Sequence, residues 1–302
     1  MDTADDQLKW PVVSLVTVNY NQSAVTCQLL ESLRACTYPA LEVIVVDNGS
    51  PTDNPDIIAE KFPSVILIKT GKNLGFAGGN NAALPYATGK YLLFINNDTE
   101  VEPNFLQPMV ELLENDQSIG MVSPRIQFFH TPGVLQYAGF TPFSKVTARN
   151  FAIGFGEHDN GQYCDVRETG SIFGAAMLVP RRVLNEVGPM DEIYFLYYEE
   201  HDWAARIKNA GYKIYFDGRS LVLHKESIST VKESPFQIYY MHRGRILFVR
   251  RNTKGFTKML SLLYHYTIVL FINTLRFLLK GRADLAKAFL RGMYWNLVNP
   301  SR

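Results

Sequence analysis

The sequence has few of the residues that stabilise small secreted proteins and zinc modules. Its 302 residues include three cysteines, Cys27, Cys36 and Cys164, which lack CxxC spacing. An odd, scattered set of this kind argues against a disulfide framework or a zinc site, so we expect reduced, buried thiols. The first ten residues also lack an apolar run behind a basic start. This predicts neither a secretory signal nor a transit peptide, and therefore a cytoplasmic protein.

Long apolar runs are scarce too, and one is only slightly too short to cross a bilayer. The longest candidate, "MLSLLYHYTIVLFINTL" (259–275), has no formal charge but is shorter than the about 20 residues that a spanning helix needs. His265 and Asn273 interrupt it. A spanning helix is therefore not favoured.

Acidic residues are nearly absent from the C-terminal part of the chain. Residues 236–302 hold twelve Lys or Arg and one acidic residue, Asp284, although the whole chain has a formal net charge of +1. Residues 1–235 are therefore acidic overall, and the composition changes near Ser234-Pro235. This change predicts a body, 1–235, followed by a basic, aromatic helical extension, 236–302.

The extension predicts contact with a membrane surface. Polar and basic positions lean to one side of a helical wheel, although apolar residues interrupt that side (Lys258, Ser261, His265, Asn273, Arg276 and Lys280). An interfacial helix with basic residues at anionic lipid headgroups fits this pattern. The alternative is a helical pair packed on the body, or a homodimer contact. No nucleic-acid-binding module accompanies the charge, so we expect no nucleic-acid partner.

The body alternates strand and helix patterns. Runs rich in β-branched or other apolar residues predict strands at 12–20, 41–47, 65–69 and 91–96, and helical spacing predicts helices at about 23–35 and 80–87. Such a series indicates an α/β fold with a mixed, mostly parallel sheet flanked by helices. In these folds ligands bind at the carboxyl ends of the strands.

Polar side chains follow the predicted strands at those ends. Asp47 stands where open α/β sheets place a carboxylate for a base or ribose, although "DNGS" (47–50) also suits a simple turn. Asn96, Asn97 and Asp98 end a strand that is apolar throughout. A carboxylate flanked by amides suits a divalent cation shared with a diphosphate. The alternative is an Asx turn capping a helix that begins near 103–104.

A glycine-rich stretch, "GKNLGFAGGNNAA" (71–83), leads into the helix predicted at about 80–87. It matches neither GxGxxG nor a phosphate-binding P-loop. Backbone N–H groups at such a helix start can still face phosphate, so the stretch is a candidate phosphate-binding loop.

The stretch "DEIYFLYYEEHDWAARIKNAGYKIYF" (191–216) joins an aromatic segment to a helix that opens with Glu199, Glu200 and Asp202. A carboxylate shielded from water suits a general base beside a sugar. The acids also suit a helix N-terminus and the aromatics a core, so the structural alternative stays open. His224 ends the strand-like run "SLVLH" and is either a metal ligand or a structural histidine.

Six ordered blocks resemble the inverting glycosyltransferases of family 2, with the nucleotide-diphospho-sugar transferase fold called GT-A, and especially bacterial rhamnosyltransferases. The resemblance covers about residues 12–230 and rests on "VSLVTVNYN", "VIVVDNGS", "NLGFAGGNNAAL", "YLLFINNDTEVEPNFL", "GAAMLVPRRVLNEVGPMDE" and "FLYYEEHDWAARIKNAGYKIYF".

The resemblance implies a nucleotide-diphospho-sugar donor such as dTDP-rhamnose, a glycan or lipid-linked acceptor in cell-surface polysaccharide synthesis, Mg or Mn as cofactor, and a peripheral location at the inner face of the cell membrane. It places Asp98 at the metal and the other donor-site residues around it (Thr17, Asn19, Asp47, Gly75 and Asn97). His224 matches a second metal ligand of some relatives. This chain departs from the family's DxD motif because Asn96 replaces the first acid.

The resemblance also implies the catalytic base. In "EEHD" (199–202) the family reads Glu-Asp-x-Asp, whose second residue is the base, so Glu200 takes that role and Asp202 is the reserve candidate. A single displacement at the sugar would invert its configuration. A nucleotidyltransferase and a non-catalytic carbohydrate-binding protein are the rival functions. Metal-dependent release of nucleoside diphosphate from a nucleotide sugar would separate the three.

Overall fold

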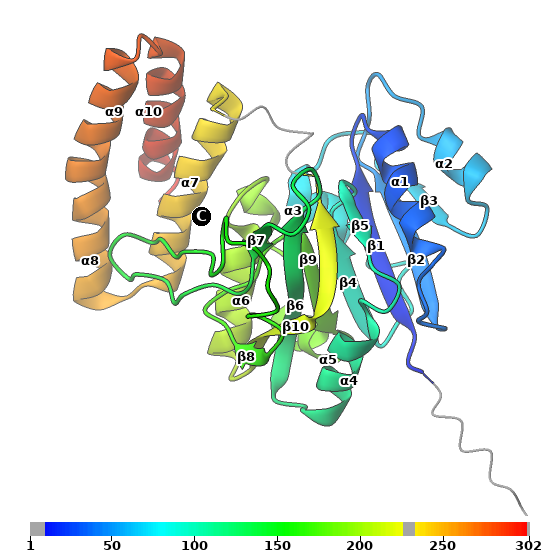
Figure 1. The fold of residues 1–302 in the computed structure, drawn as a ribbon. Coiled ribbons are helices and arrows are strands. Elements are labelled where there is room, and N and C mark those ends of the chain that lie inside the picture. Colours follow the sequence, from blue (N-terminus) through cyan, green and yellow to red (C-terminus); the bar gives the residue numbers. More distant parts are fainter. Residues whose placement is uncertain (1–9, 226–232, 301–302) are drawn as a thin grey trace, which may run out of the picture.

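The computed structural model describes residues 10–225 and 233–300. A ten-stranded mixed sheet forms the body, helices cover it, and helices α7 to α10 stand beside it (Figure 1). Residues 1–9, on which the expectation for the N-terminus rests, lie outside the described residues. The strands are β1 (Val13–Asn19), β2 (Leu41–Asp47), β3 (Ile66–Lys69), β4 (Tyr91–Ile95), β5 (Thr99–Val101), β6 (Ile119–Phe128), β7 (Leu135–Tyr137), β8 (Val166–Glu168), β9 (Ala176–Pro180) and β10 (Lys213–His224).

The helices of the body are short and those of the extension are longer. They are α1 (Ser23–Leu33), α2 (Asp56–Lys61), α3 (Gly75–Asn81), α4 (Gln107–Asn115), α5 (Arg181–Val187), α6 (Glu199–Asn209), α7 (Pro235–Asn252), α8 (Gly255–Tyr264), α9 (Leu270–Leu279) and α10 (Ala283–Val298). A 3-10 turn spans Glu192–Tyr194, and a π-helical segment, His265–Val269, joins α8 to α9.

The sheet has the order β3-β2-β1-β4-β9-β6-β10-β5. Strands β3, β2, β1, β4, β6 and β10 run in one direction, whereas β9 and β5 run in the other. The carboxyl ends of β1, β2 and β4 therefore meet at one edge, which is where such sheets bind ligands. The fold class predicted from the sequence, a mixed, mostly parallel sheet flanked by helices with a helical extension, is confirmed.

Two apolar layers hold the sheet. Helices α1 and α4 pack against one face, for example through Leu29 and Met109. Helices α3, α5 and α6 pack against the other, where the fully buried Trp203 meets Phe94 of β4 with ring centroids 5.4 Å apart. Strand β4 is buried over its whole length, which explains its uninterrupted apolar sequence.

Two predicted helices are displaced. The helix expected at about 80–87 is α3, which starts at Gly75 and ends at Asn81. It starts early because the Asn48 side chain accepts from the Leu74 N–H just before its first turn, and turns follow as far as Tyr86 around Pro85. The helix expected near 103–104 is α4, which begins only at Gln107.

The thiol prediction is partly wrong. All three cysteines are free, and Cys27 is buried, but Cys36 is half-buried and Cys164 is exposed. Cys164 lies on a surface loop, where its Sγ accepts from the Arg125 guanidinium at 3.1 Å. The exposure of Cys164 could not be predicted from hydrophobic periodicity, because the residue belongs to neither a strand nor a helix.

The extension forms its own apolar clusters beside the body. Helices α8 and α9 and the π segment make one continuous helix over Gly255–Leu279, which by length and composition alone is apolar enough to cross a membrane. It packs against α7 and α10 around Val269, Phe277 and Phe289, and it forms the outermost column of the molecule (Figure 1).

Candidate active site

A cavity of about 250 Å³ opens at the carboxyl ends of β1, β2 and β4. Its far wall is the aromatic segment that precedes α6, together with the start of α7. The lining residues are Val18, Tyr20, Asn48, Asn73, Gly75, Phe76, Asn80, Ile95, Asn96, Asn97, Asp98, Phe195, Leu196, Tyr197, His224 and Phe236. Four of the residues selected from the sequence, Gly75, Asn97, Asp98 and His224, therefore face one cavity.

The polar cluster that ends β4 is held rigidly. The Asn96 N–H donates to the Ala175 carbonyl at 3.0 Å, which ties the strand end to its antiparallel neighbour β9. The Asn97 amide donates to Thr26 Oγ1 on α1 at 3.0 Å. Asp98 is buried, and its backbone carbonyl accepts from the Lys225 N–H. A buried strand thus delivers a carboxylate into the cavity on a fixed backbone.

His224, at the end of β10, places its imidazole beside that carboxylate. Its Nε2 lies 3.2 Å from Asp98 Oδ1, and its Nδ1 lies 2.7 Å from Oε1 of Gln136 on β7. Since an amide oxygen only accepts, Nδ1 carries the proton, and in the neutral ring Nε2 presents a lone pair toward Asp98. Asp98 Oδ1 and His224 Nε2 therefore lie close enough together to bind one cation.

These two groups fit a divalent metal of the kind that keeps part of its shell for substrate. Within residues 10–225 and 233–300, no three His, Cys, Asp or Glu side chains gather as a complete site. Mg²⁺ and similar ions commonly take one or two protein ligands and complete their coordination with waters and phosphate oxygens. Gln136 also accepts a hydrogen bond from the other ring nitrogen of His224, as a residue behind a metal-binding histidine usually does.

Asp47, Asn19 and Thr17 lie beside the cavity without lining it. Asp47 Oδ1 accepts from the Asn19 amide at 2.9 Å and from Ser50 Oγ at 2.5 Å, and all but a few per cent of its surface is buried. Thr17 is fully buried, two residues before the end of β1. The next residue after β2, Asn48, reaches the cavity instead.

The glycine-rich stretch does not present free N–H groups at the start of α3. The N–H groups of Leu74 and Gly75 donate to the side-chain oxygens of Asn48 and Asn73, and the Phe76 N–H donates to the Phe195 carbonyl. The hypothesis that these N–H groups cradle phosphate is therefore wrong. The stretch instead supports the far wall of the cavity.

Glycine is required at position 75, where the glycine-rich stretch contacts segment 195–198. It has φ +75°, and a Cβ there would overlap the Phe195 carbonyl oxygen. A side chain would thus be strained twice, by its backbone conformation and by this overlap.

The aromatic segment 195–198 has an unusual backbone. Phe195, Tyr197 and Tyr198 have φ values of 65°, 67° and 77°, a left-handed region that non-glycine residues rarely adopt. The Arg243 guanidinium of α7 holds the preceding turn by donating to the carbonyl oxygens of Ile193 and Tyr194. The extension therefore helps to build one wall of the cavity.

Helix α6 begins directly after this segment, and its first residues carry the predicted base. The Glu200 side chain is 18% exposed and packs over Gly174, whose ideal Cβ would lie 3.6 Å from Glu200 Cγ. Gly174 precedes Ala175, the residue bonded to Asn96. Glu200 does not line the cavity, but it stands next to the cavity's β4 edge.

Burial shifts the pKa values of Glu199 and His201, the two residues next to Glu200 in the chain. Burial raises the pKa of the Glu199 carboxyl well above its ordinary value, and the charge of Glu200 raises it further. Burial lowers the pKa of His201, which outweighs the opposing effect of Glu200 at 3.8 Å. Both shifts favour the neutral forms of Glu199 and His201, the two residues on either side of Glu200.

Asp202 points elsewhere. Its buried carboxylate accepts from Tyr194 Oη at 2.9 Å, from Arg206 Nε at 3.1 Å and from the Asn252 amide at 2.8 Å. Three protein donors on a side chain outside the cavity describe a structural role that links α6 to α7.

Some residues of the site could not be selected from the sequence. Gln136 carries no motif and reaches His224 across 88 positions of chain. Phe236 enters from the extension. Asn73, by contrast, lies inside the block "NLGFAGGNNAAL", and its turn-forming residue type was a usable signal.

Residues 14–187 match the model of the glycosyl transferase family 2. The chain belongs to this family. A relative of this glycosyltransferase, the N-acetylglucosaminyl-diphospho-decaprenol L-rhamnosyltransferase of Mycobacterium tuberculosis, is 23% identical over 264 residues, which cover 81% of this chain and 86% of that protein. The low-salt glycan biosynthesis hexosyltransferase Agl10 of Haloferax volcanii is 22% identical over 269 residues, or 86% of this chain and 82% of that one.

Solved structures share the GT-A fold. The mannosyltransferase PcManGT from Pyrobaculum calidifontis, in complex with GDP-Man and Mn²⁺, matches with a TM-score of 0.60 at 17% identity over 95% of this chain and 87% of its own. GalNAc-T7 with UDP, GalNAc and Mn²⁺ matches with a TM-score of 0.66 at 16% identity, over 85% of this chain and half of its own. Both neighbours contain Mn²⁺ and a nucleotide or nucleotide sugar.

Proposed function

We propose that this glycosyltransferase moves a hexosyl group, rhamnose from dTDP-rhamnose, to a hydroxyl of a lipid-linked glycan with inversion at the anomeric carbon. The observation that carries the proposal is the Asp98–His224 pair, 3.2 Å apart on a cavity at the carboxyl ends of parallel strands. The rhamnosyl and lipid-linked parts draw on the printed name of the mycobacterial relative. Family membership favours this over a nucleotidyltransferase or a non-catalytic binding protein.

The donor would lie with its diphosphate at Asp98 and His224. A divalent ion, Mg²⁺ or Mn²⁺, would be held by the Asp98 carboxylate and His224 Nε2 and would offset the charge that develops on the leaving diphosphate. Asn97 orients this edge through its bond to Thr26. Gly75 allows the close approach of the far wall, and Asp47, with Asn19 and Thr17, positions the neighbouring strand end against the nucleotide.

Glu200 would act as the base. Its carboxylate accepts the proton of the acceptor hydroxyl while the oxygen attacks the anomeric carbon opposite the leaving group. The bond from that carbon to the diphosphate oxygen breaks, and nucleoside diphosphate leaves with the electron pair. Burial lowers the pKa of the neighbouring His201, which favours a neutral imidazole 3.8 Å from the Glu200 carboxyl group.

The test is turnover of nucleotide sugars by the purified full chain with Mn²⁺, Mg²⁺ or chelator, read as release of nucleoside diphosphate. Glu200→Gln should keep donor binding and reduce transfer by about 10²- to 10⁴-fold, the usual contribution of a general base. Asp202→Asn is the matched control, and it should lower stability more than transfer because it disturbs the contact between α6 and α7. Unchanged transfer in Glu200→Gln would remove Glu200 from this role.

We further propose that residues 1–235 form the catalytic unit, that 236–302 form the extension, and that the protein acts in the cytoplasm at the inner face of the cell membrane. Helix α7 starts at Pro235, where the composition changes. Because Phe236 and Arg243 of α7 contribute to the cavity wall, comparison of chains that end at 235 and at 252 tests the boundary, and cell fractionation tests the location.

A further inference from the structure

The continuous helix Gly255–Leu279 has its polar side turned inward. Ser261 and His265 are buried, and Ser261 Oγ donates to the Val146 carbonyl of the body at 2.7 Å. The buried positions 261, 265, 269 and 277 recur at multiples of four, which exceeds the 3.6 residues of a regular turn. The π-helical segment, with more residues per turn, keeps them on one side.

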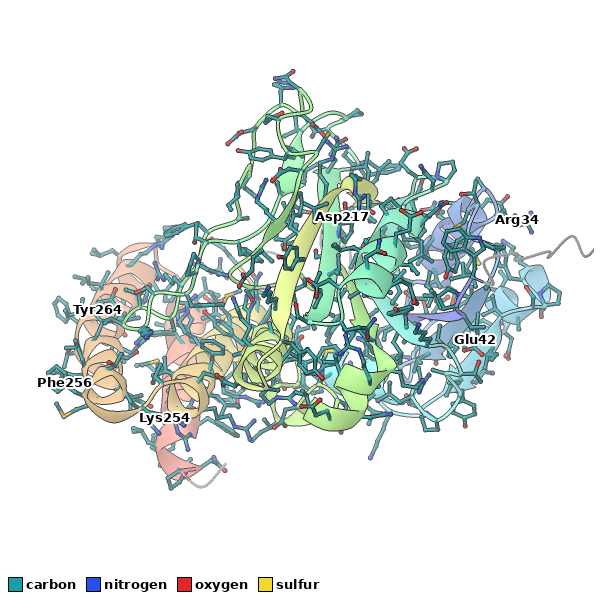
Figure 2. All side chains as sticks on the ribbon, turned by 90° about the horizontal axis from the view of Figure 1, so that it is seen from below. Arg34, Glu42, Asp217, Lys254, Phe256 and Tyr264 are labelled. Carbon is teal, nitrogen blue, oxygen red and sulfur yellow. The ribbon has the colours of Figure 1, made fainter. Side chains whose placement is uncertain are left out.

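The opposite side of this helix is a row of exposed apolar side chains. Phe256 is 71% exposed, Phe271 69% and Leu279 79%, and the others in the row are Met259, Leu260, Leu263, Ile268, Ile272, Leu275 and Leu278. In Figure 2, Phe256 lies at the outer edge of the molecule, on the first turn of this helix. A contiguous apolar surface of this extent indicates an interaction site.

Helix α10 continues this surface. Leu278 of α9 and Leu290 and Tyr294 of α10 line one shallow groove, together with Lys287 and Arg291. We call the outward apolar row of Gly255–Leu279, with Leu290 and Tyr294, the outer face.

Cations surround the outer face. Among the residues that the structure describes, Lys254, Lys258, Lys280, Lys287 and Arg291 have no ion-pair partner, and Asp284, the one acidic residue after position 235, is paired with Arg282. A second copy docking here would bring cations against cations with no acids to match, which is unfavourable. Anionic headgroups complement an apolar surface with a basic border.

We propose that the outer face binds an anionic lipid bilayer, with the Gly255–Leu279 helix lying in the interface rather than crossing it. The inward side contacts the body through Ser261 and packs against α7 and α10 through Val269 and Phe277. Only the outward side is free to enter the acyl boundary. This surface is separate from the cavity and does not depend on the proposed reaction.

The test is flotation of the purified full chain with phosphatidylcholine vesicles that do or do not contain phosphatidylglycerol. We expect binding to the anionic vesicles that weakens with salt. Phe256→Gln with Phe271→Gln should reduce the partition coefficient by about tenfold or more, given the usual value of a buried Phe. The matched control is Phe151→Gln with Phe155→Gln, two side chains of the body that are 72% and 64% exposed. That control should bind as the parent does.

A second pair tests the charges. Lys280→Glu with Lys287→Glu should reduce binding by about 25-fold or more, since each cation near the surface contributes about a factor of five. Lys61→Glu with Lys213→Glu, on the body, is the control. Nucleoside diphosphate release should be unchanged in all four variants, which keeps failure of this proposal distinct from failure of the proposed function.

Three results would overturn the proposal. One is absence of the protein from anionic vesicles, and another is equal binding by the Phe256/Phe271 variant. The third is a stable dimer in solution that the same variant converts to monomer, because a second copy would then occupy the outer face.

Discussion

Gln136→Leu tests whether an amide far from any motif sets the state of the proposed metal ligand. Gln136 is buried on β7, and its Oε1 accepts from His224 Nδ1 at 2.7 Å. Leucine keeps the volume but removes the acceptor, so the ring is free to move its proton to Nε2. That tautomer turns an N–H, rather than a lone pair, toward Asp98 and the metal.

The expected effects are separable. Loss of the hydrogen-bond acceptor behind a metal-binding histidine typically weakens metal binding about 10- to 100-fold, so the Mn²⁺ concentration for half-maximal activity should rise by that factor. The rate at saturating Mn²⁺ should change little. The free energy of unfolding should fall by about 1–3 kcal/mol, because a buried N–H loses its acceptor.

The assay is a Mn²⁺ titration of nucleoside diphosphate release, with Mn²⁺ binding measured by electron paramagnetic resonance as a readout that needs no turnover. Gln136→Glu keeps an acceptor and should rescue Mn²⁺ affinity. In His224→Ala the Gln136→Leu change should add nothing, because both act through one ligand. An unchanged Mn²⁺ requirement in Gln136→Leu, with lowered stability, would refute the reasoning and leave Gln136 a packing residue.

Two further substitutions probe the cavity wall and the extension. Gly75→Ala should destabilise the fold by more than Gly71→Ala and should raise the donor KM. Both substitutions carry the cost of about 1–2 kcal/mol for a left-handed backbone, but only a Cβ at position 75 would also overlap Phe195. Equal melting temperatures of the two variants would contradict this. Burial, with Arg245, Arg149 and His265 nearby, lowers the pKa of His242 to about 3. Below the ordinary pKa of histidine, His242 is therefore protonated in the unfolded chain but neutral in the folded one. This residue should lower the free energy of unfolding by about 2 kcal/mol between pH 7.5 and pH 5. Denaturant unfolding of the parent and of His242→Gln, each at both pH values, gives the contribution of His242 as the difference between the two proteins. The comparison with a variant is needed because the raised pKa of Glu199 changes stability in the opposite direction. Identical dependence of the unfolding free energy on pH in the two proteins would contradict the prediction.

The strands could be predicted because their sequences report burial directly. Runs such as 91–95 are apolar at every position, and that pattern survives in any fold that buries both faces of a strand. Asp98 and His224 could be selected because each ends such a run. Their meeting at 3.2 Å follows from a strand order in which β5 and β10 pair, which no local pattern contains.

The sequence was least informative where polar groups find distant partners. Ser261 and His265 mark a polar side of the Gly255–Leu279 helix, but a periodic pattern does not say whether that side meets water or protein. The polar side faces protein because Ser261 donates to the carbonyl of Val146, which lies 115 residues earlier in the chain. In the same way Asn48 and Asn73 occupy the N–H groups of the glycine-rich stretch, which on sequence alone looked available for phosphate.

Helix α7 ties the two parts of the chain together more closely than a linker would. Gly244 passes so near segment 195–198 that an added Cβ would lie 2.7 Å from the Tyr197 carbonyl oxygen, and Arg243 clamps the turn before that segment. A chimera that exchanged the C-terminal helices with those of another family member would need the matching aromatic loop as well. A substitution in α7 that moves segment 195–198 would therefore change the shape of the cavity as well as the packing of the extension.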